Sequence, residues 1–209
     1  MKIDYRKQEK ELYQPSSKEP SIVRIPELPF VMFDGEGNPN TSPRFQTAME
    51  VLYGISYGIR MSHKSDNVPE GYFEYVVPPL EGLWDIKDGI MYDPKDKENL
   101  VWTLMIRQPS FVDFELFSTV RERVKAKKKT PAIDEARFET WEEGLCCQMM
   151  HIGPYDDEPA TFSQMAEWLE SRPYERDELT HHEIYLGDAR KTAPEKLKTV
   201  LRYRIQSTR

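Results

Sequence analysis

Apolar and polar positions follow two different periods along the chain, and each change of period predicts a new element. Residues 22–33 are mostly apolar and extended, with Pro26 and Pro29 inside the run. Proline cannot donate a ladder hydrogen bond, so we predict an edge or bulged strand that ends in the turn-forming residues 34–40. A helix is predicted next, because apolar residues then recur at helical spacing. They are Phe45, Ala48, Met49, Leu52, Ser56 and Ile59.

Two glycines lie inside this predicted helix, on the side away from its apolar stripe. Gly54 and Gly58 each cost about 1 kcal/mol of helix stability relative to alanine. A helix keeps such residues where another segment approaches closely, so we expect a neighbour packed against them.

Extended segments at 72–84 and 100–106 follow, joined by a polar loop around Asp93-Pro94-Lys95-Asp96. Ser110 with Asp113 three residues later predicts the start of a connecting helix over about 111–128. The first half therefore has the order strand, helix, strand, strand.

The second half repeats this order. A strand at 137–151 precedes the turn Gly153-Pro154, and the helix after it carries Phe162, Met165, Ala166 and Leu169 on one face. Strands at 181–186 and 197–205 complete the repeat.

We predict an α+β fold of duplicated strand-helix-strand-strand modules, with two antiparallel sheets backed by helices around a central cleft. Residues 1–21 are an N-terminal extension, and 22–209 form one domain. Module one covers about 22–110, the connecting helix about 111–128, and module two about 137–205.

The charge balance excludes several classes of partner. A net charge of −7 argues against nucleic-acid binding, which needs a basic face to displace counterions from phosphates. The basic run 125–129 closes a predicted helix, where cations complement the helix dipole. No apolar stretch is long enough to span a membrane, and the charged residues 1–13 exclude a secretory signal. We expect a cytoplasmic protein whose adjacent Cys146 and Cys147 stay reduced.

Residues 181–188 carry the strongest candidate chemistry. Strand alternation places Glu183 and Tyr185, with His181, on one face. Ile184 and Leu186 lie on the other face and are expected to contact the helices, which turns Glu183 toward the cleft. Glutamates in strands are more often solvated or paired, but an acid among aromatic rings can also receive a cationic ligand or orient water.

Metal and cofactor chemistry find little support. His151, His181 and Glu183 could supply two histidines and a carboxylate, but His181 and His182 point to opposite faces and no further spacing supports a site. The sequence has no glycine-rich phosphate loop and no serine nucleophile elbow. We therefore expect no metal and no cofactor.

Aromatic residues make up 11% of the chain, enough for either core packing or a ligand site. For the tryptophans the two roles are evenly balanced, whereas packing is the commoner role for tyrosines that flank a helix stripe. Flat rings and methionines suit planar or cationic amphipathic ligands. The predicted walls are Tyr53, Tyr57, Trp84, Trp102, Met105 and Met150.

Five segments together resemble the GyrI-like small-molecule-binding domain, and they cover the chain from about residue 22 to 205. They are Asp34-Gly35-Glu36-Gly37-Asn38-Pro39, Leu52-Tyr53-Gly54-Ile55-Ser56-Tyr57, Pro79-Leu80-Glu81-Gly82-Leu83-Trp84, His151-Ile152-Gly153-Pro154-Tyr155 and His182-Glu183-Ile184-Tyr185.

This resemblance implies a duplicated SHS2-type fold, which occurs alone or fused to DNA-binding domains in multidrug-sensing activators. The segment before residue 22 is too short for a helix-turn-helix domain. The family's functional acid corresponds to Glu183, and its aromatic walls correspond to Tyr57, Trp84, Trp102 and Tyr155.

Stand-alone members of the family are associated with hydrolysis of cyclopropanoid DNA-alkylating compounds. We therefore expect a self-protecting hydrolase in which Glu183 positions or deprotonates water. Tyr155 or Tyr57 would stabilise the developing phenolate, and His151 and Tyr185 would line the site. Two alternatives stay open: a non-catalytic module that binds or senses cationic amphipathic drugs, and a protein-binding factor that protects DNA gyrase. Homodimerisation is also open.

Overall fold

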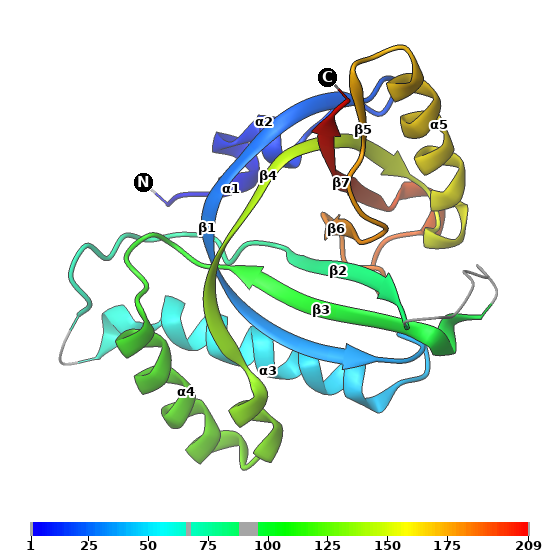
Figure 1. Cartoon of the computed structure of the whole chain (residues 1–209). Helices are drawn as coiled ribbons and strands as arrows, with labels where there is room; N and C mark the ends of the chain where they lie inside the picture. The colour runs from blue at the N-terminus through cyan, green and yellow to red at the C-terminus, as the bar shows by residue number, and fades with distance from the viewer. Residues whose placement is uncertain (1, 66–67, 88–95, 209) are drawn as a thin grey trace. The chain divides into compact units, whose positions relative to one another are not determined.

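The computed structural model describes residues 2–65, 68–87 and 96–208, and these divide into two compact units. Unit one comprises Met1–Asp4, Leu28–Pro78 and Ile86–Trp141. Unit two comprises Tyr5–Glu27, Pro79–Asp85 and Glu142–Arg209. The strands β1 (Ser21–Glu36) and β4 (Arg137–Ile152) are long enough to contribute residues to both units, as their lengths in Figure 1 indicate.

Unit one is built on an antiparallel pair of strands. The second part of β1 pairs with β3 (Leu100–Arg107), from Phe30 opposite Arg107 to Glu36 opposite Val101. Trp102 on β3 lies over Gly35, where a Cβ atom would overlap the indole ring. Its Nε1 donates to the carbonyl of Gly37 at 3.2 Å, and its ring meets Phe45 edge to face. Only glycine at position 35 leaves room for this ring.

Two helices complete unit one. The helix α3 (Pro43–Arg60) buries Ala48, Leu52 and Ile59 of the predicted apolar stripe, and Ile55 beside it, and packs on α4 (Phe114–Lys128). A Cβ atom at Gly58 would lie 2.6 Å from Val120 Cγ1 of α4, so the expected close neighbour is confirmed. The Asp113 carboxylate caps α4 by accepting from the amide of Leu116 at 2.8 Å. The helix thus begins three residues later than predicted, because the chain from Ser110 to Val112 forms a turn.

Unit two is an antiparallel sheet with helices on its faces. The strand β7 (Lys198–Ser207) pairs with β4, with β6 (His181–Tyr185) and with β5 (Tyr174–Arg176), while β2 (Leu80–Ile86) pairs with β6. The helix α5 (Glu158–Glu170) covers one face of this sheet. It packs Met165 and Leu169 against Met149, Leu201 and neighbouring residues.

The N-terminal segment covers the other face of the same sheet. Its two short helices, α1 (Tyr5–Gln8) and α2 (Lys10–Tyr13), were not predicted. The Leu12 carbonyl accepts a hydrogen bond from Arg202 at 2.9 Å, and the Ser16 carbonyl accepts one from the amide of Met150 at 3.0 Å. Residues 5–21 of the segment interpreted as an extension therefore belong to unit two, whereas Met1–Asp4 are grouped with unit one.

The structure confirms an α+β protein with antiparallel strands and corrects one predicted strand. Residues 72–79 were expected to be extended pairing segments, yet β2 begins only at Leu80. Pro78 and Pro79 provide no amide donors for a ladder, and before them only Tyr75 forms a bridge, with Ile3. Asp93, Pro94 and Lys95 of the predicted loop lie outside the described residues. Among the described residues, no helix is both long and apolar enough to cross a membrane.

Candidate functional site

The strand β6 presents its alternate side chains to opposite faces of the unit two sheet. In the register of β6 with β7, Glu183 lies opposite Leu201, and Leu201 belongs to the core beneath α5. The ring of His181 also meets that of Phe162 on α5, at 4.8 Å between centroids. The face of His181, Glu183 and Tyr185 is therefore the face that α5 covers.

This arrangement reverses the predicted facing of β6. Ile184 was expected to contact the helices, but it pairs with Val200 on the opposite face, while Leu186 follows the end of the strand. Both faces of the sheet are partly buried: α5 covers the face of Glu183, which was expected to be open, and α2 lies on the face of Ile184. The prediction that His181 and His182 point apart is confirmed by their separate partners.

On the α5 face, four side chains form a continuous hydrogen-bonded chain. Trp84 Nε1 donates to the Tyr185 hydroxyl at 2.8 Å, and that hydroxyl donates to Glu183 Oε2 at 2.8 Å. His181 Nε2 lies 2.9 Å from the other carboxylate oxygen, Glu183 Oε1. We call these four residues the Glu183 cluster. Glu183 is buried, at 8% exposure, so the cluster satisfies a carboxylate that would otherwise be costly to bury.

Two tyrosines beside Glu183 are held in the protonated form. Burial, with the negative charge of Glu183, raises the pKa of Tyr185 well above its usual range. Burial and the nearby carboxylates of Glu158, Glu183 and Asp188 raise the pKa of Tyr155 to about 12. The Tyr155 ring meets Tyr185 edge to face at 5.7 Å and is 36% exposed. At neutral pH both phenols are therefore hydrogen-bond donors and not bases.

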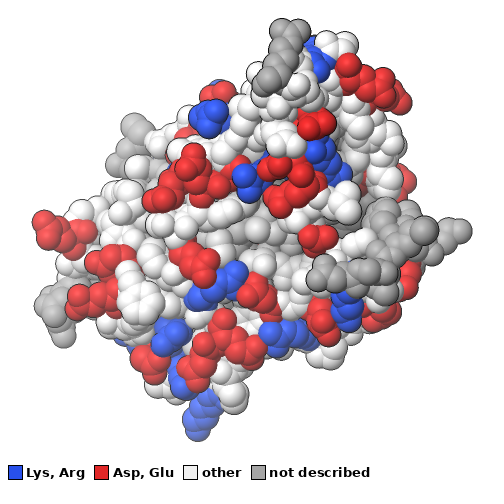
Figure 2. Space-filling view, viewed as in Figure 1, with Lys and Arg blue, Asp and Glu red and all other residues white. Residues whose placement is uncertain are grey.

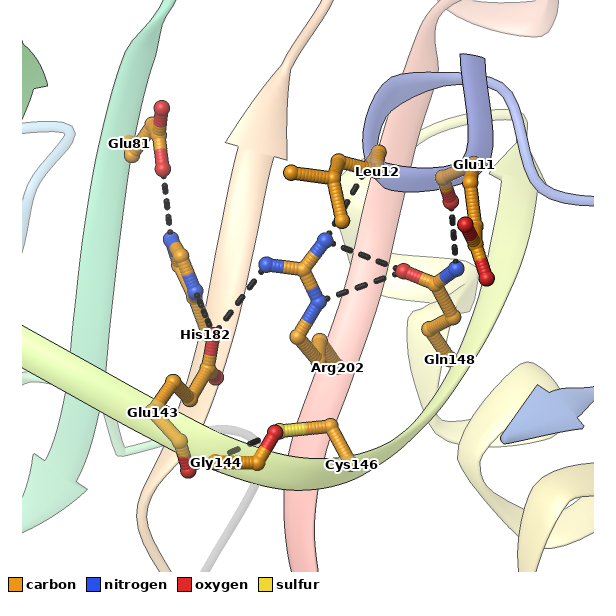
Figure 3. A network of polar contacts seen from close by, with 9 residues as sticks. All are labelled: Glu11, Leu12, Glu81, Glu143, Gly144, Cys146, Gln148, His182 and Arg202. Carbon is orange, nitrogen blue, oxygen red and sulfur yellow. Dashed lines mark hydrogen bonds and ion pairs between the residues drawn. The ribbon is translucent and has the colours of Figure 1, made fainter. Parts of the chain in front are cut away.

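The opposite face carries a buried ion network, shown in Figure 3. His182 contacts a carboxylate through each ring nitrogen, Glu143 through Nδ1 and Glu81 through Nε2, both at 3.0 Å. Arg202 Nη1 donates to the same Glu143 oxygen at 3.1 Å, and its other nitrogens reach Gln148. Figure 3 shows these side chains converging from different strands, with α2 alongside.

Charge pairing explains why this network can be buried. Burial alone would raise the pKa of Glu143, but the charges of His182 and Arg202 and their hydrogen bonds lower it to about 2. Burial alone would lower the pKa of His182, but the two carboxylates raise it to about 9. Two acids, Glu81 and Glu143, thus face two cations, and the net charge is balanced.

The members of this network are almost fully buried, so its role is to hold the fold together. It joins β2, β4, β6 and β7, and through the carbonyls of Glu11 and Leu12 it also holds α2. Sequence reasoning missed Glu143, Arg202 and Gln148. The one available signal was a charged residue between apolar neighbours, as with Arg202 between Leu201 and Tyr203, but such a pattern does not name its partner.

The remaining predicted residues of unit two have partners within their own loop and sheet. His151 bonds Thr161 Oγ1 at 2.8 Å and the Pro154 carbonyl at 3.0 Å, so its ring fixes the turn before α5. Met150 is buried on the α2 face, where its register partner is Val200. Both lie in the sheet that carries Glu183. Their contact with a ligand stays a prediction.

Four predicted residues belong to unit one. Trp102 and Met105 are buried in its core, whereas Tyr57 is 49% exposed on α3 with its ring 6.3 Å from that of Tyr53. Their roles in ligand contact stay predictions as well. Over the residues that the structure describes, no group of three or more metal-binding side chains was found.

In the face shown by Figure 2, acidic and basic side chains are interspersed, and no broad basic patch appears. Electrostatic binding of nucleic acid depends on such a patch.

Comparisons with known proteins agree on one family. A family model described as the GyrI-like small molecule binding domain matches residues 18–206. A solved structure of a hydrolase from Listeria innocua is 38% identical, covers 99% of this chain and 100% of its own, and superimposes with a TM-score of 0.91. A second Listeria innocua hydrolase is 36% identical, with coverage of 98% and 100% and a TM-score of 0.88.

A conserved Listeria innocua protein without an assigned function is 39% identical, with coverage of 98% and 100% and a TM-score of 0.91. The comparison with curated proteins found no match. Because the family model spans most of the sequence and these relatives align along almost their whole length, the chain belongs to the family of the GyrI-like small molecule binding domain.

Proposed function

We propose that this protein hydrolyses planar, electrophilic small molecules of the cyclopropanoid type. The observation that carries the proposal is the Glu183 cluster, in which a buried carboxylate lies between a histidine and a tyrosine, next to indole and phenol rings. Two relatives at 36% and 38% identity are named hydrolases, and this supports a reaction over binding alone.

The chemistry requires an activated water and a group that receives negative charge. A cyclopropane conjugated to a dienone is electrophilic at a ring carbon, and its opening sends an electron pair to the dienone oxygen. The Glu183 cluster supplies a carboxylate that orients the attacking water. Tyr155 suits the second task, because its raised pKa keeps the phenol protonated and able to donate to the developing phenolate.

Internal pairing at Glu183 favours this reaction over the binding of lipophilic cations. Each carboxylate oxygen already has one partner, His181 or Tyr185, which weakens its attraction for a ligand cation but leaves a lone pair for water. A neutral planar ligand needs no charge partner at Glu183. Flat rings bind it at small cost in side-chain entropy.

The proposal also includes an internal duplication of a strand-helix-strand-strand module. The chain order supports it, since β1-α3-β2-β3 is followed after α4 by β4-α5-β6-β7, with β5 as an addition in the second series. Residues 22–209 would then form one small-molecule-binding domain.

Incubation of the purified protein with a cyclopropanoid alkylator tests the function. Mass spectrometry should detect the ring-opened product carrying one added water, formed faster than in buffer. Tryptophan fluorescence, followed in parallel, should respond to a neutral planar analogue at least as well as to a lipophilic cation. A response limited to cations, with turnover no faster than in buffer, would support a non-catalytic drug-binding module instead.

A further inference from the structure

His181 lies in the Glu183 cluster with one ring nitrogen occupied by the carboxylate. The contact from Nε2 to Glu183 Oε1 is 2.9 Å, and the ring packs edge to face on Phe162 with an interplanar angle of 69°. These two contacts fix the plane and direction of the imidazole. The side chain of His181 is 24% exposed, against 10% for Glu183, so the imidazole is the more accessible of the two groups.

The hydrogen-bond directions in the cluster can be assigned from its one unambiguous donor. An indole nitrogen only donates, so Trp84 Nε1 uses the Tyr185 oxygen as its acceptor. The Tyr185 proton then points to Glu183 Oε2, which acts as a carboxylate acceptor. Glu183 Oε1 is likewise an acceptor, and the proton of the contact with His181 is carried by Nε2.

This assignment leaves Nδ1 of a neutral His181 with its lone pair. Among the residues that the structure describes, none makes a hydrogen bond to that atom. A carboxylate behind one imidazole nitrogen holds the ring in one tautomer and stabilises the cation that forms when the other nitrogen takes a proton. The arrangement is that of a base with an orienting acid.

We propose that His181 Nδ1 is the general base that activates water, and that Glu183 orients the imidazole. This inference rests on the proposed hydrolysis. An O–H bond of water breaks and its proton moves to Nδ1, while the water oxygen bonds to the electrophilic ring carbon. The cyclopropane C–C bond breaks, and its electron pair passes to the dienone oxygen, which takes up one proton from solvent. The imidazolium returns its proton to solvent, so the net reaction adds one water.

The proposal gives His181 and Tyr185, which both contact Glu183, different roles. His181 touches the reacting water and is a catalytic residue, whereas Tyr185 acts through Glu183 as a positioning residue. Glu183 lies between them, and the loss of its charge removes both the ring orientation and the stabilisation of the imidazolium.

Kinetics of H181A, with imidazole added to the medium, test the base. We expect kcat to fall about 10²- to 10⁴-fold while the dissociation constant of a planar analogue, read by tryptophan fluorescence, changes little. Added imidazole should restore part of kcat in a saturable manner. H63A, which removes a histidine of unit one, should keep the wild-type kcat and show no effect of imidazole.

The tautomer provides a readout that does not depend on turnover. Nitrogen-15 NMR of the histidine side chains, assigned by comparison with H181A, should show a neutral His181 protonated at Nε2, and E183Q should change that signal. A proton on Nδ1, or full activity of H181A in an active protein, would overturn the base role alone. A wild type with the expected tautomer but no turnover would overturn the proposed function and the base role with it.

Discussion

Replacing Glu143 by glutamine should destabilise the protein strongly, although the change preserves side-chain size. Glu143 is 2% exposed, and one of its oxygens serves both His182 at 3.0 Å and Arg202 at 3.1 Å. Glutamine keeps a carbonyl acceptor but removes the charge. His182 would keep the carboxylate of Glu81, whereas Arg202 would keep only the neutral acceptors Gln148 and Leu12.

The size of the effect follows from this imbalance. Removing one partner of a buried ion pair costs about 3–5 kcal/mol, since the remaining charge stays buried without compensation. For a chain of 209 residues, a loss of 1 kcal/mol lowers the melting temperature by about 2–4 °C. The melting temperature of E143Q should therefore fall by about 6–20 °C.

Urea unfolding followed by circular dichroism measures the loss directly. E143Q should lower the midpoint with little change in the slope m, which would indicate a changed stability and not a changed unfolded state. The matched control is E142Q, because Glu142 precedes Glu143 on β4 but is exposed. E142Q should stay within about 0.5 kcal/mol of the wild type. If E143Q and E142Q unfold alike, the charge of Glu143 does not stabilise the buried network.

Three further results are expected. The network should stabilise the fold most between about pH 4.5 and 6.5. Its contribution should decrease as the pH rises through the raised pKa of His182, about 9, and as the pH falls through the lowered pKa of Glu143, about 2. Urea midpoints that stayed constant toward both limits would refute this. G58A should lower the unfolding free energy, measured in a urea titration, by about 1–3 kcal/mol, because the alanine Cβ would lie 2.6 Å from Val120 Cγ1. A variant more stable than the wild type would show that α4 can move away without cost. Y185F removes the donor to Glu183 Oε2 and should reduce kcat more than it weakens ligand binding, whereas an unchanged kcat would remove Tyr185 from the positioning role.

Periodicity sufficed for most of the local structure. The apolar stripe that includes Ala48, Leu52 and Ile59 predicted α3, and the two glycines on the other side of that helix predicted a close neighbour, which is α4. Alternation along β6 correctly put Glu183 with Tyr185 and His181. These features depend only on spacing within one element.

Long-range pairing set the limit of the prediction. The facing of β6 was reversed because the polar segment 5–13 has no amphipathic pattern, yet it folds as α1 and α2 and covers the sheet. The partners of Arg202 could not be inferred, since Glu143 lies 59 residues away on β4, outside the residues Cys146 to Ile152 that pair with β7. A single charged residue in an apolar strand indicates a buried ion pair or hydrogen bond but does not identify the partner residue.

A single-turnover assay of E183Q beside E175Q is the most direct test of the carboxylate at position 183. Glu175 is an exposed glutamate of the same unit, on β5, so its replacement controls for the loss of a charge. We predict that E175Q opens the cyclopropane at the wild-type rate and that E183Q is slower by about 10²-fold or more, with the analogue still bound. Equal rates for E183Q and the wild type would contradict a catalytic contribution from the buried acid.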